Sequence, residues 1–294
     1  MKLINFTDKG VHRVGVLVKD EIADLSDVFS TYGLSIKSVE EFLREGFLEE
    51  AETVLKEAKK FYKLNEVRVD PTVRSPQKIF LAAVNYYSHS KESNLQRPEQ
   101  PYFFTKFQNA LAGPFEEIKK PKSSEKMDYE GELAVIIGKK CKYVSRSEAM
   151  SCVAGYTVAN DISFRDWQFP PGWPNAKSPY GLNWVMGKAM DQALPLGPYL
   201  VTKDEVPDPY SLSIKTTVNG EIRQDGRTSD MIFKIDELIS YLSQGITLLP
   251  GDVISTGTPE GVAAFKGERY LKPGDVVRVE ISGLGAIENK IVEE

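Results

Sequence analysis

Two glutamates lie two residues apart at the start of a strongly apolar segment. Glu130 and Glu132 belong to DYEGELAVIIG, residues 128–138. Because side chains alternate across a β-strand, we expect both carboxylates on one face. Asp128 is on the same side; we expect it to be solvated, with a role as a partner of the ligands as the alternative. Two like charges beside an apolar strand are costly unless a cation lies between them. The pair is therefore a candidate for binding a divalent cation, although an isolated Glu-X-Glu pair is commoner at a solvated strand end.

A third carboxylate ends the next apolar segment. Asp161 follows VAGYTVAN, which predicts a second strand shortly after the first. If the two strands share a sheet, Glu130, Glu132 and Asp161 converge, and without a cation they would repel one another or take up protons. An all-oxygen ligand set favours a hard ion, so we expect Mg²⁺, with Mn²⁺ or Ca²⁺ as alternatives. Three protein ligands leave coordination positions for water and substrate.

Two further polar side chains follow Asp161. A helical turn within NDISFRDWQFPP, residues 160–171, would place Arg165 and Gln168 on the face of Asp161. An arginine beside a metal site is suited to bidentate binding of a substrate carboxylate. The alternative is an ion pair with Asp161 or Asp166 and no role in substrate binding.

His89 is one of only two histidines. It follows the predicted strand KIFLAAV, and Glu92 comes three residues later. On a helical turn the two side chains would be neighbours, and the glutamate would fix the imidazole tautomer and raise its basicity. Residues 86–100, rich in polar side chains, are suited to act as a lid. From spacing alone, an exposed histidine without a catalytic role is the commoner outcome.

Lys188 and Thr258 carry weaker signals. Lys188 is one of 37 lysines and arginines, and taken alone it is expected to be solvated. Thr258 lies in TGTPEG, residues 256–261, after an apolar strand. The glycines there would let the backbone and the Thr258 hydroxyl approach a ligand, or they would simply form a tight turn.

The elements that position these residues divide into two predicted domains. Residues 1–70 predict a small α/β domain, with a strand over 11–18, a short strand and turn over 21–29, and helices within 38–64 interrupted at Gly46. Residues 71–294 predict a mainly β domain. Its apolar or alternating runs are ELAVIIG, CVAGYTVAND, PYLVT, SIKTTVNGEIRQ, DVISTGT and DVVRVEISGLG, and its clearest helix is IDELISYLSQG. The fold class is therefore α+β, mainly β.

Composition excludes several classes of protein. The chain has 294 residues, a formal net charge of -5 and a sequence pI near 5.4, which give no electrostatic reason to expect nucleic acid or an anionic membrane as partner. No basic segment with a long apolar run begins the sequence, and no apolar stretch is long enough to span a membrane, so we expect the cytoplasm. Cys141 and Cys152 are interpreted as a free loop thiol and a free core thiol.

Taken together, the motifs resemble the fumarylacetoacetate hydrolase family from about Lys78 to the C-terminus. The resemblance rests on seven ordered segments: NYYSHSKE at 85–92, PYFFTKF at 101–107, DYEGELAVIIGKK at 128–140, VAGYTVANDISFRDWQ at 153–168, GKAMDQALPLGPYLVT at 187–202, VNGEIRQDGRTSDMIF at 218–233 and LLPGDVISTGTPEGV at 248–262. Two places depart from the family pattern. KAMDQA at 188–193 replaces KSFDTF, and 169–181 reads as an extended loop before Lys188.

The resemblance implies a mixed β-sandwich roll that forms homodimers. It also implies a role for each candidate residue: Glu130, Glu132 and Asp161 hold the metal, His89 and Glu92 are the lid pair that activates water, Lys188 lies beside the metal, and Arg165, Gln168 and Thr258 bind substrate.

The resulting hypothesis is a metal-dependent hydrolase that cleaves a C–C bond in an acylpyruvate-like 2-oxo acid, of the fumarylacetoacetate or fumarylpyruvate type. An oxaloacetate decarboxylase, or an isomerase of the 2-hydroxyhepta-2,4-diene-1,7-dioate type from aromatic degradation, is the alternative, because both need an enolate but no attacking water. A non-catalytic metal-dependent sensor of 2-oxo acids is the alternative outside enzymes. The presence of His89, Glu92 and Lys188 together argues against it.

Overall fold

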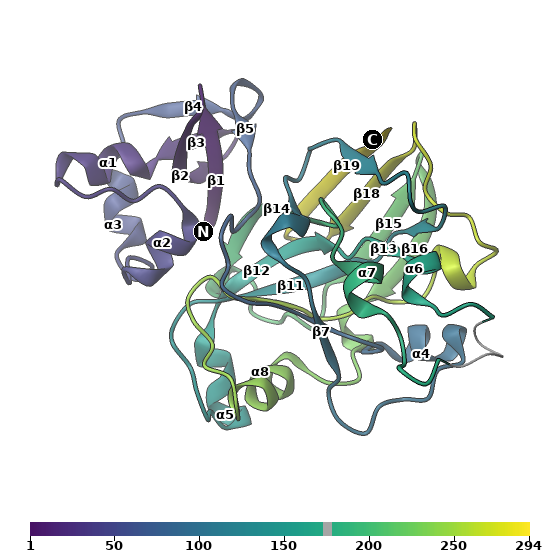
Figure 1. Ribbon diagram of the computed structural model, residues 1–294. Coiled ribbons are helices and arrows are strands. Elements are labelled where there is room, and N and C mark those ends of the chain that lie inside the picture. The colour runs from purple at the N-terminus through teal and green to yellow at the C-terminus, as the bar shows by residue number, and fades with distance from the viewer. Residues whose placement is uncertain (173–177) are drawn as a thin grey trace.

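The computed structural model describes residues 1–172 and 178–294. They form a smaller N-terminal lobe and a larger body built on β-sheets (Figure 1). Residues 173–177, in the middle of the extended loop expected at 169–181, lie outside the described residues.

The N-terminal lobe is a short antiparallel sheet covered by three helices. Its elements are β1 (Lys2–Asp8), β2 (Val11–Val18), β3 (Glu21–Asp24), α1 (Leu25–Thr31), α2 (Val39–Arg44), α3 (Ala51–Lys56), β4 (Phe61–Lys63), η1 (Leu64–Glu66) and β5 (Arg68–Val69). Asp24 and Ser38 accept backbone N–H bonds at the starts of α1 and α2, which satisfies exposed helix donors. The strand predicted over 11–18 is confirmed, and so is the helix break, where Gly46 has φ 82°.

One expectation in this lobe is wrong. The helical region predicted to continue to residue 64 ends at Lys56, and residues 61–63 form β4, which pairs with β3. Tyr62 lies beside Phe6 at a ring distance of 5.2 Å, so contact with the lobe core replaces the local helical preference.

The largest sheet continues from the lobe into the body. Its order is β4-β3-β2-β1-β14-β12-β11-β17-β6-β7, because β1 pairs with β14 across the boundary predicted near residue 70. That boundary stays a prediction. The strands of the body are β6 (Ile79–Ala82), β7 (Phe103–Thr105), β8 (Leu111–Ala112), β11 (Gly131–Ile137), β12 (Val153–Asn160), β14 (Leu194–Thr202) and β17 (Val253–Ser255).

A second sheet packs against this one. Its order is β16-β15-β18-β19-β9, and its strands are β9 (Ile118–Lys120), β15 (Ser213–Val218), β16 (Glu221–Arg227), β18 (Val276–Ile281) and β19 (Gly285–Glu293), with β10 (Met127–Asp128) and β13 (Ser163–Phe164) pairing separately. Leu133 and Val158 of the first sheet share a buried core with Val279 and Ile287 of the second. The expected α+β, mainly β fold is therefore confirmed.

Short helices border the sheets. They are α4 (Tyr87–Ser93), α5 (Arg146–Ala149), α6 (Arg165–Gln168), α7 (Trp184–Lys188) and α8 (Ile235–Ser243), with 3₁₀ turns η2 (Gln108–Ala110), η3 (Met150–Cys152), η4 (Lys203–Glu205), η5 (Thr228–Asp230) and η6 (Ala263–Phe265). Within the described ranges, every helix is too short or too polar to cross a membrane.

The interpretation of the cysteines as free thiols is wrong. Cys141 and Cys152 form a disulfide, with their Cα atoms 6.2 Å apart. Cys141 follows β11 and Cys152 precedes β12, so antiparallel pairing of the two strands brings the thiols together. The spacing of 11 residues matches none of the familiar cysteine motifs, which is why the sequence did not reveal the pair.

Candidate active site

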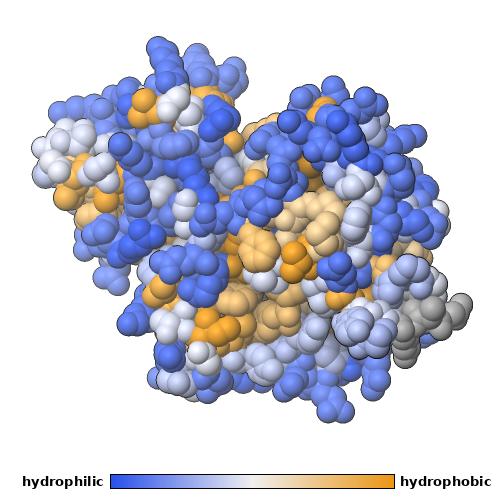
Figure 2. All heavy atoms as spheres, viewed as in Figure 1, coloured by the Kyte–Doolittle hydropathy of each residue, from blue (hydrophilic) through white to orange (hydrophobic). Residues whose placement is uncertain are grey.

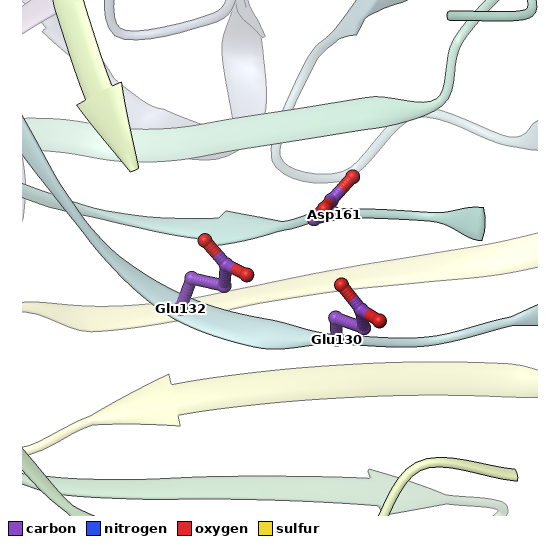
Figure 3. A group of neighbouring side chains, drawn as sticks. All are labelled: Glu130, Glu132 and Asp161. Atoms are coloured by element: carbon purple, nitrogen blue, oxygen red, sulfur yellow. The ribbon is translucent and has the colours of Figure 1, made fainter. Parts of the chain in front are cut away.

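The three predicted carboxylates meet at the open end of the β11–β12 pair. Glu132 lies opposite Ala159, and the Asp161 N–H donates to the Glu130 carbonyl oxygen at 2.8 Å. Each of the three carboxylates offers an oxygen within 4.8 Å of the others, and all three residues are buried. Figure 3 shows their side chains pointing toward one another from the two neighbouring segments. The antiparallel register therefore joins residues that are about 30 positions apart in the chain.

Lysines neutralise part of this negative charge. Lys188 Nζ lies 2.6 Å from Glu130 Oε2 and 2.6 Å from Asp161 Oδ2. Lys106 Nζ lies 2.8 Å from Asp161 Oδ1 and donates to the carbonyl oxygens of Ile162 and Ala193. Burial lowers the pKa of Lys106 to about 8, although the Asp161 charge opposes that shift. Sequence reasoning missed Lys106 as a site residue; its place directly after the apolar PYFFT segment was the available signal.

The carboxylates differ in how their charge is compensated. Glu132 Oε2 accepts from Ser255 Oγ at 2.5 Å and from the Gly257 N–H at 3.0 Å. Burial, together with the negative charges of Asp161 and Glu130, raises the pKa of Glu132 well above its ordinary value. Burial also favours the neutral form of Glu130, but the charges of Lys188 and Arg165 outweigh it and lower the pKa of Glu130.

This arrangement fits a divalent cation. The donors are hard oxygens, they converge within one ion's reach, and one of them is held in surroundings that disfavour its charge. Glu130, Glu132 and Asp161 would hold the ion, and Lys188 would then give up contacts that now bridge two of these ligands.

Arg165 makes different contacts from those considered in the sequence. Its Nε donates to Asp128 Oδ2 at 2.9 Å, Nη1 donates to Gln168 Oε1 at 2.8 Å, and Nη2 donates to Glu130 Oε1. Neither Asp161 nor Asp166 is its partner in these contacts. The expectation that Asp128 is solvated is wrong, since its carboxylate is fully buried.

His89 and Glu92 lie on α4, as the helical spacing predicted. His89 Nδ1 is 3.1 Å from Glu92 Oε1, and Glu92 also accepts from the Gly261 N–H at 2.9 Å. At the start of α4, Ser88 donates both its N–H and its hydroxyl to Asp230. Hydrogen bonds at its first and last turns therefore hold α4 to the neighbouring segments.

His89, the three carboxylates, Lys188, Arg165, Gln168 and Thr258 line one cavity of about 50 Å³. The Thr258 hydroxyl donates to the Gly131 carbonyl oxygen at 2.9 Å and accepts from Gln224 at 2.8 Å. The rest of the wall is largely apolar, and it includes Phe104 and Trp184, whose rings stack at 4.7 Å. The structure thus brings together all the residues singled out in the sequence, with Lys106 and Asp128 behind them.

Comparison with known proteins gives a consistent family. The model for the fumarylacetoacetate (FAA) hydrolase C-terminal domain matches residues 78–292. The chain is 44% identical over 254 residues, or 84% of its length and 78% of the relative's, to the human (Homo sapiens) protein named oxaloacetate tautomerase FAHD2A, mitochondrial.

Solved structures agree over the whole chain. Fumarylacetoacetate hydrolase from Exiguobacterium antarcticum superposes with a TM-score of 0.85 at 32% identity, covering 100% of both chains. Maleylpyruvate hydrolase from Sphingobium sp. SYK-6, in complex with manganese(II) and pyruvate, gives a TM-score of 0.80 at 31% identity, covering 100% of this chain and 99% of that one. With the domain model spanning most of the sequence and the carboxylate cluster in place, the chain belongs to the fumarylacetoacetate hydrolase family.

Proposed function

We propose that this chain is a metal-dependent enzyme that enolises a small 2-oxo dicarboxylate, and that its reaction is the keto–enol tautomerisation of oxaloacetate. The observation that carries the proposal is that His89, whose Nδ1 lies beside Glu92, lines the same small cavity as the three carboxylates and Lys188. The name of the human relative supports the choice of substrate.

The residues have distinct parts in this reaction. In the neutral tautomer in which His89 Nδ1–H donates to Glu92, Nε2 is the atom that would remove a proton from C3 of the 2-oxo acid. A divalent cation held by the three carboxylates would act as a Lewis acid on the 2-oxo group. Lys188 stabilises the negative charge that develops on the former carbonyl oxygen, and transfer of the proton from His89 Nε2 to that oxygen completes the enol. In this reaction no water attacks and no C–C bond breaks.

Hydrolysis of an acylpyruvate, the main interpretation from the sequence, becomes the second candidate. It would use the same pair to deprotonate water, and the relative named maleylpyruvate hydrolase favours it. What favours tautomerisation over this candidate is the similarity to the human relative named oxaloacetate tautomerase. Decarboxylation and isomerisation of the types named above share the enolate and remain further outcomes of the same test.

The test is a panel assay of the purified protein with Mg²⁺. Enol-oxaloacetate, keto-oxaloacetate, acylpyruvates and hydroxymuconate-type diacids are followed by ultraviolet absorbance and by product analysis, with His89→Ala as the control. We expect faster interconversion of the oxaloacetate tautomers than with His89→Ala and no pyruvate release. Cleavage of an acylpyruvate without tautomerisation would favour the second candidate, and no turnover of any compound would favour the 2-oxo acid sensor.

The ion, the assembly and the compartment are also proposals. Mg²⁺ is our first choice, while the complex of a related hydrolase with manganese(II) supports testing Mn²⁺ alongside it. A homodimer is proposed because exposed apolar side chains gather near the edge strand β7 and helix α7: Tyr102, Phe107, Val185 and Met186. Figure 2 shows a broad apolar region on the face that carries these elements. The cytoplasm remains the proposed compartment, although the human relative's name places that protein in mitochondria.

A further inference from the structure

Asp128 is a buried carboxylate that the proposed reaction does not use directly. Its Oδ1 accepts from the N–H groups of Tyr129 and Ala263, both at 2.8 Å. Its Oδ2 accepts from the Ala264 N–H at 3.1 Å and from Arg165 Nε at 2.9 Å. One side chain therefore joins three segments: the strand that leads to Glu130, the turn that carries Arg165, and the 3₁₀ turn η6.

The hydrogen bonds of Arg165 differ in whether the acceptor is a proposed metal ligand. Nη2 is bound to Glu130, a proposed metal ligand, so a cation in the cluster would compete for that partner. The Nε bond goes to Asp128, which lies outside the proposed ligand set, and it would persist. Asp128 can therefore hold the guanidinium in place while Nη2 exchanges Glu130 for a ligand carboxylate.

Asp128 also binds the segment that contacts helix α4, which carries His89 and Glu92. The segment it binds through Ala263 and Ala264 follows Gly261, whose N–H donates to Glu92. The same segment ends in Phe265, whose ring centroid lies 5.9 Å from that of His89. The arginine and the proposed base are thus positioned through one short stretch of chain.

We propose that Asp128 is a positioning residue: it aims Arg165 at a carboxylate of the 2-oxo acid and ties that arginine to the segment that holds the His89 helix. This inference rests on the proposed function only in assuming a 2-oxo acid ligand. It assigns Asp128 no contact with substrate or metal.

The test is Asp128→Asn in the full chain, with Asp166→Asn as its matched control. Asp166 is the exposed carboxylate next to Arg165 in sequence, and it bonds to Ser124 and Glu125 instead. The probe is oxomalonate, a 2-oxo dicarboxylate with no C–H bond to enolise, titrated calorimetrically into Mg²⁺-loaded protein. Mn²⁺ affinity is measured separately by electron paramagnetic resonance, and hydrogen exchange is followed over residues 87–93.

We expect Asp128→Asn to weaken oxomalonate binding about tenfold or more, the usual scale for losing a charge-assisted bond. Mn²⁺ affinity should fall by less than the roughly 10- to 100-fold usual on losing a direct partner of a metal ligand, because the bonds of the Asp128 carboxylate go to none of the three proposed ligands. A general loss of structure would not spare Mn²⁺ binding in this way. Exchange over 87–93 should become faster, and Asp166→Asn should leave all three measurements unchanged. Unaltered oxomalonate affinity in a folded Asp128→Asn protein would overturn the proposal.

If Asp128→Asn folds poorly, a double-variant cycle tests the proposal instead. Removing the charges of Asp128 and Arg165 together leaves neither of them buried without its partner. Asp128→Asn combined with Arg165→Gln should bind oxomalonate as weakly as Arg165→Gln alone. A further loss of about tenfold in the double variant would mean that Asp128 acts independently of Arg165. Because oxomalonate binding needs no turnover, these results stand even if oxaloacetate is not the substrate.

Discussion

The two ends of the β11–β12 pair are held together by different kinds of interaction. At the loop end, the Cys141–Cys152 disulfide joins the strands, and Cys141 exchanges backbone hydrogen bonds with Leu248. At the open end, Glu132 and Asp161 are drawn together beside two lysines, with no covalent link.

This comparison indicates that the loop end of the hairpin contributes mainly to stability and the open end mainly to function. The bonds at the loop end would be the same with or without a ligand. The contacts at the open end are ion pairs whose partners can exchange when a cation or an anion arrives, because Lys188 and Arg165 both bind Glu130. A buried cluster of like charges is costly without its counter-ion, so the open end gains most from metal. Each of the following experiments perturbs either the open end or the loop end.

Removing a metal ligand should have the largest effect. In Glu132→Gln the cluster loses one anionic donor, and we expect Mg²⁺ affinity to fall more than about 100-fold, beyond the usual loss for an outer partner. Turnover should fall with it, while thermal stability without metal should be kept or rise, because a disfavoured charge is removed. Metal affinity is measured by calorimetry, and Glu117→Gln, a surface change, is the control. Retained affinity would contradict the three-ligand site.

Removing the proposed base should leave the metal site intact. We expect His89→Ala to lower turnover about 10²- to 10⁴-fold, the range for general acid–base catalysis. Metal affinity should stay nearly the same, because His89 bonds to Glu92 and not to the cluster in the contacts above. Steady-state kinetics and metal titration on the same preparation check this, and unchanged turnover would remove the proton-transfer role.

Breaking the loop end should affect stability alone. Closing a loop between cysteines 11 residues apart is worth about 3 kcal/mol by the chain-entropy model. We expect Cys141→Ala with Cys152→Ala to lower the free energy of unfolding by about that amount and to leave kcat and metal affinity within twofold. Denaturant unfolding is the measurement, and thiol counting under denaturing, non-reducing conditions is its control, since two free thiols in the unaltered protein would rule out the disulfide.

Acidification should weaken the metal effect gradually. The pKa of Glu132 is raised in the metal-free fold, so its proton stabilises that fold in acid, and this stabilisation is lost as pH rises through the raised pKa. Metal binding requires the unprotonated carboxylate and therefore competes with the proton. We expect the rise in Tm caused by Mg²⁺ to be largest at neutral pH and to shrink as pH falls. A metal-induced Tm shift that stays constant down to pH 5 would contradict the raised pKa.

Most local elements followed from sequence patterns, and the failures have a common cause. Apolar or alternating runs predicted β11 and the segment that forms β15 and β16, whose turn residues Asn219 and Gly220 both have positive φ. The helical pattern before residue 64 gave a wrong prediction, because residues 61–63 pair with β3 as strand β4. Free thiols and a solvated Asp128 were expected because their partners lie elsewhere in the chain.

The sequence by itself determined which chemical groups were available: two glutamates on one strand face, an aspartate at the end of the next strand, and a histidine spaced for a glutamate partner. The tertiary structure decided which of them share one buried volume, and it added Lys106 and Asp128. The physical reason is that alternation and helical spacing are local properties. Register, burial and charge compensation arise only when segments that are distant in the chain are packed against each other.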